Sequence, residues 1–160
     1  MKFSLLKIDK ISGDKSSFYT VQMEEGTILF DRFINENSKL HEKEIRDILQ
    51  RIRAMAHRTG AQEHFFKLHE GKPGDGVCAL YDEPDANLRL YCIRFGSAIV
   101  IIGGGGLKEK IIREFQQNKK LTDENYLLRE ISAEITDKMK SGEIRFSDDE
   151  LEFIGNLDFI

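Results

Sequence analysis

The sequence predicts an α+β domain in which helices pack on a mainly antiparallel sheet. Two patterns support this prediction. Short apolar segments separated by turn residues occupy residues 77–102, and longer segments with helical spacing lie on either side of them. Short apolar or alternating runs indicate strands, whereas apolar residues that recur about every three or four positions indicate helices. A chain of 160 residues is most simply one domain, here residues 1–160.

The first 60 residues contain two predicted strands and two predicted helices. The strands are residues 2–9 and 18–23, which flank a turn-forming cluster of Ser, Gly, Asp and Lys. A short helix follows over residues 24–37, with Thr27 near its N-cap. Residues 41–60 then show the clearest helical period in the chain, so one stripe of this helix is expected to face a core.

A block of three strand candidates follows a turn rich in Gly and Pro. They are residues 77–82, 88–95 and 98–102. The last two are separated by Gly96 and Ser97, and a two-residue Gly-X loop between apolar runs favours an antiparallel hairpin.

The two-residue loop also predicts a register for this hairpin. Arg89 would lie across from Gly104, and Arg89, Tyr91 and Ile93 would share one face of the sheet, with Arg94 on the other. Val100 and Ile102 are expected on the same face as Ile93.

Two further helices are predicted after the glycine run. One covers residues 107–118, and the other covers residues 122–140 with Thr122 as its cap. The ending, residues 143–160, is expected to form a hairpin or a tail that docks on a partner.

Charge is distributed unevenly along the chain, whose formal net charge is −4. Residues 89–120 carry seven Lys or Arg against two acidic residues, whereas residues 121–160 carry four against eleven. A basic segment beside an acidic one indicates either an anion-binding surface that the chain itself shields or simply a solvated surface of paired charges. We expect acidic groups of the second segment, such as Glu130 or Glu134, to lie near Arg89.

Four consecutive glycines, residues 103–106, lead from the last apolar strand to a lysine-rich segment. A glycine-rich turn before a helix can bind phosphate through its backbone N–H groups. The spacing fits neither a P-loop nor G-x-G-x-x-G, so a tight connector or close backbone packing is the stronger interpretation. With Arg89 across from the glycines and Lys108 beside them, the group is also a plausible phosphodiester clamp. The alternative is that Arg89 pairs with a carboxylate and the lysine is solvated.

No metal site and no cofactor are predicted. His57, His64 and His69 are spaced by seven and five positions, whereas helical ligands on one face are about three or four apart. Cys78 and Cys92 lie within apolar strand-like segments and are expected to be buried free thiols.

We predict a cytoplasmic protein without membrane contact. Lys7 and Asp9 interrupt the apolar run at the N-terminus, so that run is not expected to be a signal peptide. Elsewhere no apolar run approaches the ~18 residues that a membrane-spanning helix requires.

The strand block resembles the RelE/ParE/HigB superfamily of bacterial toxins, with the closest similarity to its Gp49-like branch. The resemblance covers a core of about residues 40–120. It rests on Leu88-Arg89-Leu90-Tyr91 at the start of the middle strand, on the apolar run after it, and on the lysines that follow the glycines. It implies a RelE-like core to which residues 121–160 add an acidic extension with an extra C-terminal helix.

The resemblance implies a protein that acts on RNA within a toxin–antitoxin pair, or a relic of such a pair. Its partners would be RNA, including ribosome-bound messenger RNA, and an antitoxin protein. A metal-independent endoribonuclease of this family would use Arg89 as phosphate clamp, Lys108 or Lys110 as electrostatic partner and Tyr91 in acid/base chemistry. The remaining RNA contacts would be Lys110, Arg113, Gly104 and Gly105.

Three departures from the family pattern leave a second hypothesis open. Residues 103–106 replace a frequent histidine-glycine-phenylalanine sequence, residues 77–82 carry no basic residue, and the Arg89 face is strongly apolar. A sheet that is apolar on both faces is expected to be covered on both. The chain would then be a catalytically inactive toxin-fold protein that serves as a protein-interaction or regulatory module.

Overall fold

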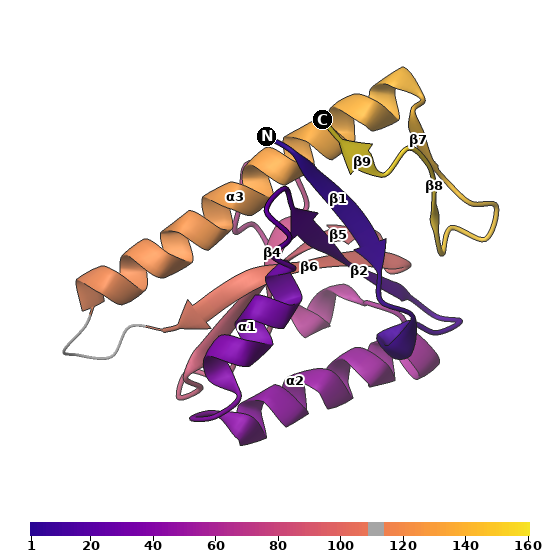
Figure 1. The fold of residues 1–160 in the computed structure, drawn as a ribbon. Helices are drawn as coiled ribbons and strands as arrows, with labels where there is room; N and C mark the ends of the chain where they lie inside the picture. The colour runs from indigo at the N-terminus through magenta and orange to yellow at the C-terminus, as the bar shows by residue number, and fades with distance from the viewer. Residues whose placement is uncertain (109–113) are drawn as a thin grey trace.

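Helices cover both faces of a seven-stranded sheet in the computed structural model of the protein, which describes residues 1–108 and 114–160 (Figure 1). The strand order is β3-β4-β5-β6-β2-β1-β9. Neighbouring strands are antiparallel except for β2 and β6, which are parallel. The predicted α+β class with a mainly antiparallel sheet is therefore confirmed.

The elements have the following bounds. The strands of the large sheet are β1 (Phe3–Lys7), β2 (Ser17–Met23), β3 (Phe66–Lys67), β4 (Val77–Leu80), β5 (Leu88–Phe95), β6 (Ile99–Leu107) and β9 (Asp158–Phe159). The α-helices are α1 (Leu29–Asn37), α2 (Glu42–Ala54) and α3 (Glu114–Ser141). A separate hairpin consists of β7 (Ile144–Phe146) and β8 (Phe153–Gly155).

The sheet has a hydrophobic core on each face. Helices α1 and α2 pack on one face and α3 crosses the other, as Figure 1 shows. Side chains of β5 alternate between the two cores: Leu90 and Cys92 face α1 and α2, whereas Tyr91 and Ile93 face α3. Because both faces are covered, β6 begins as a continuous apolar run instead of an alternating one.

Strands β5 and β6 form the predicted hairpin, but the predicted register is wrong. The turn has three residues, so Phe95 pairs with Ile99, and Arg89 pairs with Gly106 instead of Gly104. A β-bulge shifts the register again opposite Tyr91. A turn one residue longer than expected moves every later pair along the strand.

The same shift changes which residues of β6 meet α3. Ile99 and Ile101 take the predicted places beside Ile93 in the α3 core. Val100 and Ile102, which were expected there, face α1 and α2. A slip of one residue moves a side chain to the other face of a sheet.

Two predicted helix starts are also wrong. Helix α3 is continuous and contains Thr122 in its interior. Thr27, in contrast, does lie near the N-cap of α1, which is Ile28. Leu107 ends β6 and does not start a helix. Residues 109–113 of the predicted helix lie outside the described part of the chain. Threonine also occurs within helices, so a capping residue type alone does not fix a helix start.

The C-terminal segment forms a hairpin and then returns to the sheet. After β7 and β8, β9 pairs with β1 and forms the edge of the large sheet, and the rings of Phe3 and Phe159 stack with centroids 4.2 Å apart. The two termini therefore lie side by side near α3 (Figure 1). Within residues 1–108 and 114–160, no helix combines the length and the apolar character that crossing a membrane demands.

Candidate functional site

Arg89, Tyr91 and Lys108 lie together, as predicted, in a pocket of about 530 Å³ between β5, the end of β6 and α3. Arg89 and Tyr91 are two positions apart on β5, so both side chains point to the α3 face. Lys108 directly follows β6, and its backbone N–H donates to the carbonyl of Asn87 at 2.7 Å. We call this site the basic pocket; its described lining is Arg89, Tyr91, Lys108, Leu121, Thr122, Asn125, Tyr126 and Arg129.

A buried carboxylate, Asp82, holds the cations of the basic pocket in place. Lys108 Nζ lies 2.5 Å from Asp82 Oδ2, and Lys67 Nζ and Arg89 Nε lie 3.2 and 3.5 Å from Asp82 Oδ1. Burial acts to raise the pKa of Asp82, but the interactions with these cations outweigh it and hold the pKa below its ordinary value. Three cations around one carboxylate leave a local excess of positive charge.

Arg89 has hydrogen-bonding capacity that the described part of the protein does not use. Its Nε is buried and makes only the 3.5 Å ion pair with Asp82, which is too poorly aligned for a hydrogen bond. Burial acts to lower the pKa of Arg89, but Asp82 raises it further, so the group stays charged. A charged, partly buried guanidinium in the wall of a pocket indicates a place for an anion.

Tyr91 has a raised pKa because it is buried. Its hydroxyl is therefore protonated at neutral pH, so it can donate a hydrogen bond or a proton but is a poor general base. Sequence reasoning placed Tyr91 correctly beside Arg89, and the structure limits the chemistry it can perform.

Helix α3 adds five residues to the basic pocket that sequence reasoning missed, and three of them, Asn125, Tyr126 and Arg129, interact with one another. Arg129 Nε donates to Asn125 Oδ1 at 2.7 Å, and Arg129 Nη2 donates to the Glu70 carbonyl at 3.0 Å. Its guanidinium carbon lies 4.8 Å from the ring centroid of Tyr126. The only signal in the sequence was the helical spacing of residues 125 and 129, which a solvated helix face shows equally well.

The expectation that acidic residues of α3 lie beside Arg89 is wrong. The α3 residues that line the basic pocket are neutral or basic, and Glu130 is exposed to solvent. Neither Glu130 nor Glu134 lines the pocket. Glu124 is the buried acid of this helix, and it pairs instead with Lys120 and with Arg32 of α1.

The glycines are not a phosphate-binding turn. Gly104 and Gly105, predicted as RNA contacts, are buried within β6. A Cβ atom at Gly105 would clash with the carbonyl of Arg89, and one at Gly104 would clash with the carboxylate of Glu124. Close backbone packing, the stronger interpretation from the sequence, therefore explains these glycines. The other predicted contacts, Lys110 and Arg113, lie outside the described residues.

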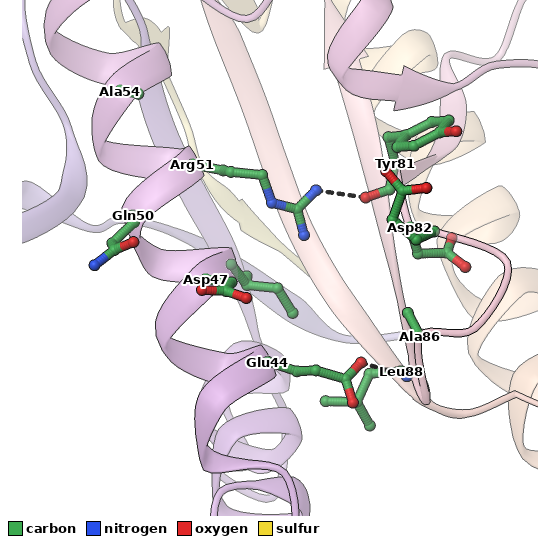
Figure 2. Close-up of a pocket in the computed structure, with 11 residues that line it drawn as sticks. Glu44, Asp47, Gln50, Arg51, Ala54, Tyr81, Asp82, Ala86 and Leu88 are labelled. Atoms are coloured by element: carbon green, nitrogen blue, oxygen red, sulfur yellow. Dashed lines mark hydrogen bonds between the residues drawn. The ribbon is translucent and has the colours of Figure 1, made fainter.

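A second cleft of about 460 Å³ lies between α2 and residues 81–88 (Figure 2). Arg51 reaches from α2 across this cleft and donates to the carbonyl of Tyr81, and Glu44 accepts from the backbone N–H of Leu88 at 3.2 Å. We call this cleft the acidic groove, because its charged lining residues are Glu44, Asp47, Asp82 and Glu83 around the single cation Arg51.

The described residues contain no cluster of His, Cys, Asp or Glu that could hold a metal ion. Cys78 and Cys92 are buried free thiols that face each other across β4 and β5. Burial raises the pKa of Cys78 to about 12, so this thiol is not a reactive nucleophile.

Comparison with protein-family models, curated proteins and solved structures found no match to this chain. The resemblance to the toxin superfamily stays a prediction.

Proposed function

We propose that this chain binds RNA and that the basic pocket holds its phosphodiester backbone. The observation that supports this most strongly is Arg89, a charged and partly buried guanidinium that lines the basic pocket. Lys108 and Arg129 line the same pocket and add positive charge. The planar guanidinium can give two parallel hydrogen bonds to one phosphate, which suits a phosphodiester better than a single point charge would.

The resemblance to the RelE/ParE/HigB toxins supports RNA as the ligand. We accordingly propose a toxin-superfamily protein that acts in the cytoplasm, with an antitoxin protein as its second partner. In a metal-independent cleavage reaction, Arg89 and Lys108 would stabilise charge on the phosphate and Tyr91 would donate a proton. Binding is favoured over cleavage, because no described residue of the pocket is a good proton acceptor at neutral pH.

The second candidate is a catalytically inactive toxin-fold protein that serves as a protein-interaction or regulatory module. Asp82 favours this candidate, because it already pairs with Lys67, Arg89 and Lys108. The cations would then stabilise the fold instead of binding a ligand.

Fluorescence anisotropy with a labelled single-stranded RNA distinguishes the two candidates. Arg89→Gln should weaken binding by about tenfold or more, because a charged hydrogen-bonded contact contributes about 1.5–3 kcal/mol. Arg89→Lys should recover only part of the loss. Arg46→Gln is the matched control, since Arg46 lies on α2 with its side chain 65% exposed. Equal weakening by Arg89→Gln and Arg46→Gln, or no RNA binding by the unmodified protein, would contradict the proposal.

A further inference from the structure

We infer that Tyr126 is a stacking platform for one unpaired base of the bound RNA, so that the ligand is single-stranded. This inference rests on the proposed function. Tyr126 is 55% exposed, and it lines the basic pocket together with Arg89 and Lys108. A nucleotide whose phosphate contacts Arg89 therefore has an exposed aromatic ring within the same pocket.

The ring of Tyr126 is supported by an immobilised cation. The guanidinium carbon of Arg129 lies 4.8 Å from the ring centroid, and two hydrogen bonds, to Asn125 and to the Glu70 carbonyl, fix that guanidinium. Among the described residues, no other aromatic side chain contacts Tyr126. A ring that is held on one side and open elsewhere loses little conformational freedom when a base stacks on it.

The surrounding polar groups predict little discrimination between bases. The Asn125 amide is buried, donates to the Glu70 carbonyl at 2.9 Å and accepts from Arg129 at 2.7 Å. Its amide is therefore not available to read the edge of a base. A ring that stacks on a base, without hydrogen bonds to the base edge, can bind any of the four bases. The base must be unpaired, because a base within a duplex is already stacked on its neighbours.

Exposure of a tyrosine ring is not by itself evidence of a base-stacking site, as Tyr81 shows. Tyr81 is 42% exposed, but it lines the acidic groove, where carboxylates would repel a phosphate backbone. Tyr81 and Tyr126 thus form a matched pair: each exposed ring has one cation beside it, but the two rings line clefts of opposite charge.

The test measures dissociation constants by anisotropy for three labelled ligands of equal length. These are single-stranded oligouridine, an abasic ribose-phosphate oligomer and an RNA duplex. Tyr126→Ala should weaken binding of oligouridine by about 5- to 100-fold and leave binding of the abasic oligomer nearly unchanged. Tyr126→Phe should restore the affinity, and Tyr81→Ala should have no effect.

Three outcomes would overturn the inference. Unchanged oligouridine binding by Tyr126→Ala would remove the stacking role and leave the proposed function intact. Equal losses for oligouridine and the abasic oligomer would show that Tyr126 only shapes the pocket. Failure of the unmodified protein to bind any of the three ligands would overturn the proposed function together with the inference.

Discussion

Asp82 connects the basic pocket and the acidic groove, which have opposite electrostatic character. It lines the acidic groove, where Arg51 is the one cation among the described lining residues, and it pairs with Arg89 and Lys108 of the basic pocket. The local ratio of charges around one buried group, and not the formal net charge of −4, therefore sets which surface can receive an anion.

The two arginines differ in how they are used. Arg51 closes the acidic groove by donating to the Tyr81 carbonyl (Figure 2), and burial lowers its pKa. Arg89 makes only a long ion pair with Asp82, and its pKa is raised by that carboxylate against the effect of burial. Arg51 links two parts of the fold, whereas Arg89 lines a pocket that can receive a ligand.

Removal of residues 121–160 should have the largest effect on folding. It removes one wall of the basic pocket but none of the residues that line the acidic groove. Leu128, Ile131 and Ile135 of α3 are fully buried against the sheet. Burial of each such side chain contributes about 1.5–3 kcal/mol, so the shortened chain should not fold. Circular dichroism and solubility measure this outcome. A folded, shortened chain that binds RNA more tightly would instead show that this segment is a built-in inhibitor.

Asp82→Asn should have the next largest effect, because it removes a carboxylate that lines the acidic groove and pairs with two cations of the basic pocket. Without that charge, Lys67, Arg89 and Lys108 repel one another, and the free energy of unfolding should fall by about 3 kcal/mol. Urea denaturation measures the change. Asp47→Asn is the control, since Asp47 is an exposed residue of the acidic groove, and it should change stability by less than about 0.5 kcal/mol.

The stabilisation by Asp82 should also depend on pH. Its pKa in the folded protein lies below the ordinary value of 3.8, so its contribution is fully present above that pH. The contribution should be lost as the pH falls through the lower, folded-state value. Denaturation curves of the unmodified protein and Asp82→Asn should therefore converge in acid. A difference that persists unchanged at low pH would show that the charge of Asp82 is not its stabilising feature.

Sequence patterns predicted the fold class and three members of the basic pocket. The alternation of β5 was sufficient to place Arg89 and Tyr91 on one face, because the two-residue period of a strand does not depend on register. The same patterns failed for the strand partners of β6, where a turn of three residues replaced the expected two and shifted each pair. Turn length was not determined by a Gly-Ser pair, since hairpin turns of both lengths contain Gly.

The rest of the basic pocket depends on contacts between distant segments. Asp82 follows β4, Lys67 belongs to β3, and Arg129 lies in α3, so only the folded chain brings them to Arg89. The side chain of Asp82 is 5% exposed, but a single acidic residue after a strand gives no sign of such burial. The excess of acidic residues in 121–160 also led to the wrong expectation that acids of α3 lie beside Arg89. The packing of a helix, and not its net charge, determines which of its faces meets a pocket.

An NMR titration of ¹⁵N-labelled protein with single-stranded oligouridine tests most directly the claim that the basic pocket, and not the acidic groove, receives RNA. We predict saturable shifts of the backbone amides at residues 89–91, 106–108 and 122–129, and small shifts at residues 44–51 of α2. The Arg89→Gln protein should give the same spectrum without RNA outside the immediate neighbourhood of residue 89, and much weaker shifts with it. Shifts that centre on α2, or shifts that spread over the surface without saturation, would contradict the account.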